Sequence, residues 1–326
     1  MRETPALEVE NLTVRFRRNN VDVAAVNGVS FALARGEVLT ILGESGSGKS
    51  VSLKATLGLL PAYARIEGAI RVGGADVLTM SPRALAKMRG SAVSMIFQEP
   101  MTALDPVYTV GEQIVETIVK HEGVDRGTAG ARALELLERV KIPSAARRLK
   151  NYPHEMSGGM RQRAMIALAL ACSPSVLLAD EPTTALDVTV QIQILLLLRQ
   201  LQEELGMAIV FVTHDVGVAA EISDRIAVMY AGRFVEEGAA RDVLLHPQHP
   251  YTQGLLSSTV HGAMRGRVLE TIPGSPPNLA ELPPGCPFAP RCRHAIRACT
   301  EADPPVVHPA AGVMVRCIRA TEAVAA

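Results

Sequence analysis

The sequence predicts an α/β fold built on a parallel β-sheet with helices on both faces. Short aliphatic runs, typical of buried parallel strands, alternate along the chain with segments of helical length. Hydrophobic residues make up 48% of the 326 residues, whereas aromatic residues make up 3% and tryptophan is absent. The core is therefore expected to be aliphatic, and the chain is long enough for one large domain or two smaller ones.

The first part of the chain is expected to form strands and the next part helices. Residues 7–16 and 28–42 carry alternating or continuous apolar residues, bounded by glycine and asparagine. From about residue 85 to residue 172 the apolar spacing becomes helical. This order predicts a β-rich segment that precedes a helical one.

A buried strand and a long helix are expected after the helical segment. Residues 175–181, SVLLADE, form a short aliphatic run that ends in two carboxylates. Residues 188–205 follow with helical spacing, with Asp187 as the expected N-cap and Gly206 as the residue that ends the helix. A further buried strand is expected at residues 207–215.

The last third of the chain changes in character. Residues 224–238 are typical of a hairpin that turns at Ala231 and Gly232. Between residues 246 and 309 several segments are dense in proline, which favours extended or turn structure over a packed sheet. We therefore expect a small appended region after about residue 245.

Charge and hydropathy exclude several classes of protein. Lys plus Arg number 33 and Asp plus Glu also number 33, so no general affinity for nucleic acid is expected. The first residues lack the apolar segment of a signal peptide. The most apolar stretch is broken by Ser173 and Pro174 after about ten residues, short of the roughly 20 that a membrane span needs. A reducing compartment is expected, in which a disulfide framework is unfavourable.

A phosphate-binding loop is predicted between an apolar strand and a helix. The segment GESGSGKS fits the pattern G-x-x-x-x-G-K-[ST], in which glycines let backbone N–H groups point at phosphate. Lys49 would reach the β- and γ-phosphates and Ser50 would bind Mg²⁺. A Gly/Ser turn before an ordinary helix is the alternative, but the flanking strand and helix favour the loop. Its residues are Gly43, Glu44, Ser45, Gly46, Ser47, Gly48, Lys49 and Ser50.

Polar residues at the ends of other expected strands can complete a nucleotide site. Asp180 can hold Mg²⁺ through water, and Glu181 can orient and deprotonate the attacking water. His214 follows another aliphatic strand and could contact the γ-phosphate or position water. Gln98 lies between the β-like and helical segments, where a side chain that senses Mg²⁺ would be useful. Each residue alone is more often structural, and the phosphate loop strengthens the assignment.

The segment SGGMRQR, which begins at Ser157, resembles the signature motif of ABC-transporter ATPases. The order of loop, Gln98, signature, the Asp180–Glu181 pair and His214 matches that family over about residues 5–245. The resemblance implies a P-loop NTPase core with a parallel sheet, an N-terminal antiparallel β subdomain and a helical subdomain at about residues 99–172.

The resemblance also implies further residue roles. Ser157, Gly158, Gly159 and Met160 would act on the ATP of a partner subunit, and Asp187 would form the D-loop. Phe16 would stack on adenine, although a core phenylalanine is an equally good interpretation. Met156 and Met160 replace the leucine and glutamine of the usual signature. Loss of the glutamine removes a polar contact without abolishing the site, because hydroxyl and backbone N–H groups remain.

A narrower resemblance covers almost the whole chain. FQEPMTALDPVYTVGEQI, LADEPTTALDVTVQ and HPQHPYTQGLL are similar to segments of the ATPase subunits of dipeptide and oligopeptide importers, a group that includes nickel importers. The resemblance implies an ATPase domain at residues 1–245 and an extension at residues 246–326. It implies a second related ATPase subunit, two membrane permeases, an extracytoplasmic solute-binding protein and a place on the cytoplasmic face of the bacterial inner membrane.

Other functions are less consistent with the sequence. A DNA-directed ABC ATPase needs a long coiled coil between the loop and the signature, but the interval from Ser50 to Ser157 is too short and lacks heptads. An ABC translation factor needs two complete motif sets, and this sequence has one. A binding module without hydrolysis typically lacks Glu181 or His214, and both are present. The transported solute is not determined by this chain.

Four of the five cysteines lie within 32 positions near the C-terminus, with the spacing C-x5-C-x6-C-x17-C. Free thiols, structural zinc and an iron–sulfur cluster are the three interpretations. Zinc sites usually contain C-x2-4-C pairs, whereas four thiolates suit [4Fe–4S] and tolerate longer spacing. The similarity to peptide importers with a cluster-binding tail favours [4Fe–4S], which would stiffen a segment without its own core; neighbouring arginines, Arg291 among them, would offset its charge. The predicted ligands are Cys286, Cys292, Cys299 and Cys317.

Overall fold

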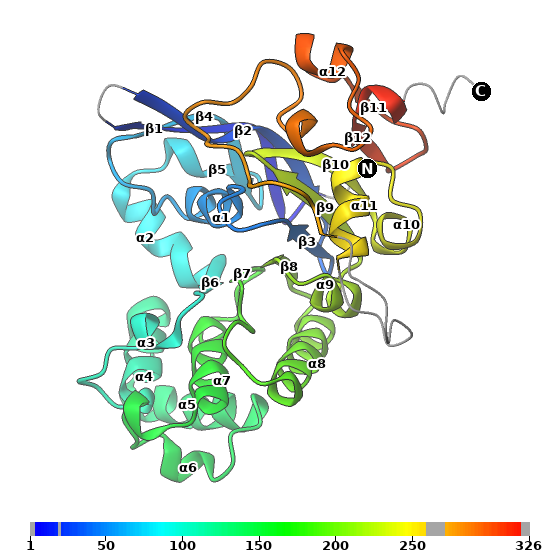
Figure 1. Cartoon of the computed structure of the whole chain (residues 1–326). Helices are drawn as coiled ribbons and strands as arrows, with labels where there is room; N and C mark the ends of the chain where they lie inside the picture. The colour runs from blue at the N-terminus through cyan, green and yellow to red at the C-terminus, as the bar shows by residue number, and fades with distance from the viewer. Residues whose placement is uncertain (1–3, 19–20, 259–270, 321–326) are drawn as a thin grey trace. The chain divides into compact units, whose positions relative to one another are not determined.

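The computed structural model describes residues 4–18, 21–258 and 271–320 (Figure 1). The chain forms two compact units, each assembled from separate stretches of sequence. The first unit contains Met1–Glu8, Ala32–Glu37 and Arg71–Phe211, and the second contains Val9–Phe31, Val38–Ile70 and Val212–Ala326. Within the described ranges, every helix is too short or too polar to span a bilayer. The α/β class is confirmed, while the limits 1–245 and 246–326 stay a prediction.

The second unit contains two groups of strands. The strands β2 (Val21–Leu33), β1 (Leu7–Arg18) and β4 (Ala64–Val72) lie side by side in this order. In the other group β3 (Val38–Leu42) runs parallel to β9 (Arg225–Tyr230). All five residues of β3 are buried, as the continuous apolar run of the sequence predicts.

The predicted hairpin at Ala231 and Gly232 is confirmed. Strand β9 pairs antiparallel with β10 (Arg233–Ala239). The turn residues have φ angles of 48° for Ala231 and 78° for Gly232. Two successive positive φ angles are what a tight two-residue hairpin turn requires, because its twist then matches the strands.

The proline-rich region adds strands to the sheet, which corrects the sequence-based expectation. Strand β12 (Met314–Arg316) pairs antiparallel with β10, and β11 (Val306–Val307) pairs antiparallel with β12. The prolines concentrate in the segments before these strands, so they leave the β12 ladder intact.

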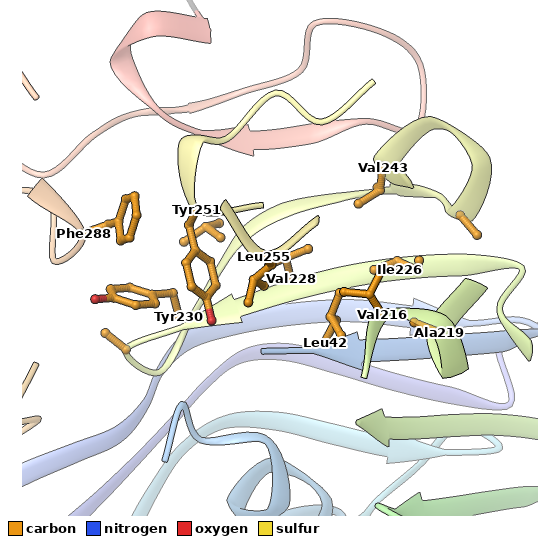
Figure 2. Packing of buried hydrophobic residues seen from close by; sticks show 13 residues of the cluster. Leu42, Val216, Ala219, Ile226, Val228, Tyr230, Val243, Tyr251, Leu255 and Phe288 are labelled. Atoms are coloured by element: carbon orange, nitrogen blue, oxygen red, sulfur yellow. The ribbon is translucent and has the colours of Figure 1, made fainter. Parts of the chain in front are cut away.

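The C-terminal region also shares a hydrophobic core with β3 and β9, so it is not without a core (Figure 2). Tyr251 is fully buried and Phe288 is 3% exposed, and both pack with Leu42, Val228 and Tyr230 in one cluster. The sequence-based expectation of an aliphatic core misses this aromatic group, because three aromatic residues distant in sequence gather at one point. The helices of this unit are α1 (Lys49–Thr56), α9 (Val216–Ile222), α10 (Ala240–Leu245), α11 (Pro250–Ser257) and α12 (Ala298–Glu301), with a 3₁₀ turn at Ala289–Arg291.

Buried polar groups hold the start of α11 in place. The carboxylate of Glu236, 1% exposed, accepts hydrogen bonds from the backbone N–H groups of Gln248 (2.7 Å) and His249 (2.9 Å). Nδ1 of His249 accepts from the N–H of Tyr251 (3.0 Å), and burial lowers the pKa of His249 to about 3, so its ring is neutral. Because these contacts fix the helix start, the orientation of Tyr251 is well defined.

The first unit combines short parallel strands with most of the helices. Strands β6 (Val93–Ile96) and β7 (Val176–Asp180) are parallel neighbours, and β8 (Ala208–Thr213) follows β7 in the strand order. Strand β5 (Ala75–Asp76) pairs antiparallel with the end of β4. The helices are α2 (Pro82–Ser91), α3 (Pro100–Ala103), α4 (Val110–Glu122), α5 (Arg126–Arg139), α6 (Ala145–Arg148), α7 (Gly158–Ala169) and α8 (Val188–Leu205), with 3₁₀ turns at Val77–Thr79 and Pro153–Glu155.

The ends of α8 and the strand β6 can be compared directly with the elements expected from the sequence. The expected caps of α8 are confirmed: the Asp187 side chain accepts a hydrogen bond from the N–H of Val190 (3.0 Å), and Gly206 ends the helix with φ of 61°. The helical assignment from residue 85 to residue 172 is wrong at β6, because an apolar run of four residues is too short for periodicity to distinguish strand from helix.

Candidate functional site

The predicted phosphate loop connects β3 to α1 in the second unit. Gly46 and Gly48 have φ angles of 80° and 107°, which side chains rarely tolerate. A Cβ atom on Gly43 would lie 2.2 Å from the carbonyl oxygen of Met229, and one on Gly48 would lie 2.3 Å from that of Ala25. The glycines are therefore required by close backbone contacts as well as by the turn.

Lys49 begins α1 and its ammonium group lies inside the loop. The residue is 4% exposed, and Nζ donates to the carbonyl oxygens of Gly43 (2.7 Å) and Glu44 (2.9 Å). Ser50, also in the first turn of α1, is half-buried. The arrangement concentrates a cation, a hydroxyl group and a helix N-terminus at one curve of the chain, which suits an anionic phosphate chain.

Two other predicted residues lie in the second unit. His214 follows β8 directly and is exposed, and Asp215 after it caps α9 by accepting from the N–H of Gly217 (2.7 Å). Phe16, in β1, is half-buried, with its ring edge-on to that of Tyr63 at 6.1 Å. Phe16 is thus outside the buried core, and both aromatic rings are accessible to a flat ligand.

The predicted carboxylates lie at the end of β7 in the first unit. Asp180 is 4% exposed, whereas Glu181 is half-buried and has a φ angle of 46°. One carboxylate oxygen of Glu181 accepts from Oγ1 of Thr184 (3.0 Å) and from Nε2 of Gln98 (3.4 Å). The fold therefore brings together Gln98 and Glu181, which are 83 positions apart, and the unusual φ directs Glu181 away from the regular strand path.

The signature segment forms the N-terminus of α7, also in the first unit. Ser157 caps the helix by accepting a hydrogen bond from the N–H of Met160 (3.4 Å). Ser157 and Gly158 are exposed, and a Cβ atom on Gly159 would lie 2.8 Å from the side chain of Val190. Met156 is buried at 4% exposure, so methionine fills the apolar position that leucine has in the usual signature. The exposed hydroxyl and first-turn N–H groups can bind an anion.

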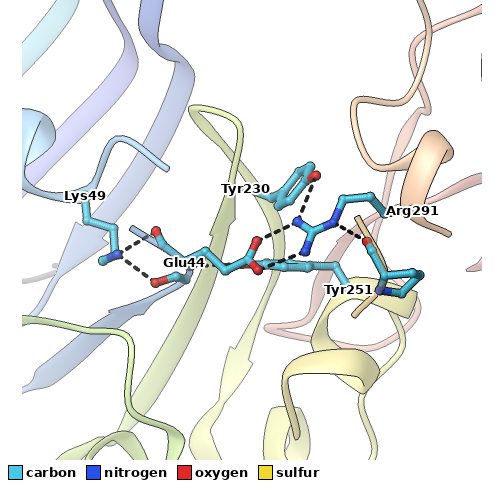
Figure 3. A network of polar contacts seen from close by, with 7 residues as sticks. Glu44, Lys49, Tyr230, Tyr251 and Arg291 are labelled. Carbon is cyan, nitrogen blue, oxygen red and sulfur yellow. Dashed lines mark hydrogen bonds and ion pairs between the residues drawn. The ribbon is translucent and has the colours of Figure 1, made fainter. Parts of the chain in front are cut away.

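A polar network behind the phosphate loop was missed by the sequence analysis (Figure 3). Arg291 donates from Nη1 and Nη2 to the two carboxylate oxygens of Glu44, at 2.7 and 3.0 Å. The backbone N–H of Glu44 donates to the hydroxyl group of Tyr251 (2.9 Å). Arg291 thus pairs with the loop, while its expected role as a counter-charge for a metal centre stays a prediction. The sequence carries no local signal for a pair separated by 247 positions.

The four C-terminal cysteines lie in one neighbourhood of the second unit. Cys286, Cys292 and Cys299 are half-buried and Cys317 is 9% exposed. The N–H of Cys286 donates to the carbonyl oxygen of Cys299 (2.8 Å). Burial, with a smaller contribution from nearby Cys299 and Cys317, raises the pKa of Cys286 to about 11, and the same causes raise the pKa of Cys292. Among the residues described here, no three His, Cys, Asp or Glu side chains are arranged to hold one metal ion.

Two family models match the chain. One is described as ABC transporter and matches residues 26–184, and the other, oligopeptide/dipeptide transporter C-terminal region, matches residues 235–299. The oligopeptide transport ATP-binding protein OppD of Salmonella typhimurium is 51% identical over 298 residues, which cover 91% of this chain and 89% of the relative. OppD of Haemophilus influenzae is 50% identical over 295 residues, covering 90% and 91%.

Solved structures agree with this match. A dimeric structure of MJ0796, a bacterial ABC transporter cassette, is 30% identical with a TM-score of 0.65, covering 72% of this chain and 99% of that one. The fold and the phosphate loop together define an ATP-binding cassette of the ATP-hydrolysing class. The chain belongs to the ABC transporter family, in the group of oligopeptide transport ATP-binding proteins.

Proposed function

We propose that this chain is the ATP-binding and ATP-hydrolysing subunit that energises a membrane importer of dipeptides and oligopeptides. The observation that carries the proposal is the similarity to oligopeptide transport ATPases over about nine-tenths of the chain, including the C-terminal region. Import of nickel or another small solute is the alternative. A soluble ABC ATPase without a transport role is the third candidate, and the match to the transporter C-terminal region disfavours it.

Each residue of the proposed ATP site has the role expected from its motif. The loop from Gly43 to Ser50 binds the phosphates, with Lys49 on the β- and γ-phosphates, and Phe16 stacks on adenine. The buried carboxylate of Asp180, the hydroxyl group of Ser50 and the amide of Gln98 offer the oxygen ligands that Mg²⁺ prefers. Bound Mg²⁺ would neutralise charge on the phosphates.

Hydrolysis requires a group that accepts a proton from the attacking water. We assign this role to Glu181, whose carboxylate is oriented by Thr184 and Gln98. The water oxygen forms a bond to the γ-phosphorus as the bond from phosphorus to the bridging oxygen of ADP breaks, and the water proton passes to Glu181. His214 contacts the γ-phosphate or positions the water.

The signature requires a second subunit. Ser157, Gly158, Gly159 and Met160 would contact ATP bound to a partner, and Asp187 would lie at the same junction. MJ0796, which is similar to this chain, has been solved as a dimer, and also in a post-hydrolysis state with ADP and Pi. We infer a heterodimer with a related ATPase that carries the glutamine form of the signature. The other proposed partners are two membrane permeases and an extracytoplasmic solute-binding protein. The proposed location is the cytoplasmic face of the bacterial inner membrane.

We further propose that Cys286, Cys292, Cys299 and Cys317 bind a [4Fe–4S] cluster, with Zn²⁺ as the alternative. Cys299 contributes to the raised pKa values of Cys286, Cys292 and Cys317, and the four thiols supply the ligand type and number that either centre needs. A cluster spans a wider ligand set than a single ion does, which suits these spacings. Bound to the thiolates, it would link Cys317, which follows β12, to the loop segment that carries the other three.

Anaerobically purified chain is expected to contain about four iron and four sulfide ions, with broad visible absorption. Cys299→Ser should lose the iron, because one of four ligands is removed. Cys172→Ser is the matched control, since Cys172 lies in the first unit, and it should retain the iron. Stoichiometric zinc without visible absorption would replace the cluster by its alternative, and an anaerobic preparation free of both metals would refute a metal centre.

The transport role can be tested in the bacterium that carries the gene. Replacing the chromosomal copy by Lys49→Ala, at equal protein level, should abolish uptake of a radiolabelled tripeptide because the importer lacks energy. Uptake of radioactive Ni²⁺ in the same cells should be unchanged. Loss of nickel uptake with normal peptide uptake would favour the alternative, and normal uptake of both would contradict the proposal.

A further inference from the structure

The phosphate loop receives its support from a residue 247 positions away in the cysteine-containing region. Lys49 donates to the carbonyl oxygens of Gly43 and Glu44 in this structure. When Lys49 turns toward a bound phosphate, these two carbonyls lose their shared cation, and other contacts must keep the loop curved. Glu44, two residues after the end of β3, makes such contacts, and the carbonyl oxygen of Ser47 makes another by accepting from the N–H of Gly232 (2.9 Å).

Glu44 is held on its side chain and on its backbone. Arg291 binds both carboxylate oxygens in a bidentate pair, with its own side chain 5% exposed and that of Glu44 27% exposed. The backbone N–H of Glu44 donates to Tyr251, whose position is fixed by the buried start of α11. A two-point guanidinium–carboxylate pair restricts orientation more than a single contact does.

The guanidinium group of Arg291 is held by further contacts, so its orientation toward Glu44 is well defined. Its Nε donates to the carbonyl oxygen of Pro273 (2.9 Å), and Nη1 also reaches the hydroxyl group of Tyr230 (3.4 Å). The guanidinium carbon lies 5.9 Å from the centre of the Tyr230 ring, and that ring packs on Tyr251 at 4.5 Å. A cation held by a carbonyl, a hydroxyl group and an aromatic ring has little freedom to leave the loop.

We propose that Arg291 is a positioning residue of the phosphate loop, through which the C-terminal region takes part in ATP binding. The proposal rests on the nucleotide site proposed above. Arg291 precedes Cys292 directly and ends the turn Ala289–Arg291, so the arrangement of the cysteine segment sets the position of the guanidinium. The C-terminal region therefore does more than cover the sheet: it preorganises the loop that binds the phosphates.

The test measures ATP affinity by equilibrium titration of the full-length chain, together with the melting temperature without nucleotide. Arg291→Ala and Glu44→Ala are each expected to weaken ATP binding about tenfold, and the double variant no more than the single ones, because both remove the same contact. Arg291→Lys should recover part of the affinity, because an ammonium group cannot bind both oxygens as the guanidinium does. If Arg291→Ala does not fold, Glu44→Gln tests the same pair at a partly exposed site.

A second ion pair of the C-terminal region provides the control. Asp303 accepts from Arg233 in β10 (2.8 Å), in a pair separate from that of Arg291 and Glu44. Asp303→Ala should leave ATP affinity unchanged, whatever its effect on the melting temperature. ATP affinity within twofold of wild type in Arg291→Ala and Glu44→Gln would overturn the proposal. The ion pair would then stabilise the fold without affecting ATP binding. Retention of ATP binding by Lys49→Ala would instead overturn the nucleotide site itself.

Discussion

Replacing Glu181 with glutamine is expected to lower the rate of ATP hydrolysis by about a hundredfold or more, while ATP binding is retained. General-base catalysis typically contributes about 10²–10⁴ in rate, and an amide of the same shape cannot take the proton from water. The amide can still contact Thr184 and Gln98, whose side chains reach Glu181 at 3.0 and 3.4 Å. The folded structure and the affinity for ATP should therefore be retained, while the rate of ATP hydrolysis falls.

The measurement is phosphate release by the assembled transporter, with nucleotide occupancy determined in the same sample. Because bound ATP, which the proposed partner subunit also contacts, is not hydrolysed, the variant should also accumulate as an ATP-bound assembly during gel filtration. Glu203→Gln is the matched control, since Glu203 is exposed near the end of α8 and pairs with Arg199 (3.3 Å). Undiminished turnover in Glu181→Gln would refute the assignment of Glu181 as the base.

Features decided by near neighbours were predictable from the sequence. The caps of α8 were predicted because an N-cap side chain binds backbone three residues on and a C-terminal glycine adopts a left-handed conformation by itself. The hairpin at Ala231 and Gly232 was predicted for the same reason. The curvature of the predicted phosphate loop is also local, since it depends on glycines within eight positions, while its binding role stays a prediction.

Features that depend on distant segments were predictable only where motif order indicated them. Strand β12 is three residues long and exists because β10 offers it an edge, which no pattern within the proline-rich region indicates. The pairing of Glu44 with Arg291 was missed because each residue alone resembles an ordinary surface charge. The convergence of Gln98 on Glu181 was anticipated through motif order, and the contact itself follows from the fold.

Replacing Lys49 with alanine is expected to weaken ATP binding by about ten- to a hundredfold. This is the size expected when charge-assisted contacts of about 1.5–3 kcal/mol are lost. Lys49 is 4% exposed inside the loop, so the ammonium group meets a phosphate where water is largely excluded and the contact is strengthened. The change is measured by equilibrium titration with ATP on the purified chain.

Lys54→Ala separates this effect from a general loss of positive charge. Lys54 lies on the same helix α1 but is exposed, so its removal should leave ATP affinity within about twofold because surface charges are screened. Lys49→Ala also frees the carbonyl oxygens of Gly43 and Glu44, which should lower the melting temperature slightly without nucleotide. Full ATP affinity in Lys49→Ala would show that the loop is not the phosphate site. A lower melting temperature combined with weak binding would show that Lys49 both stabilises the loop through its carbonyl oxygens and binds the phosphate.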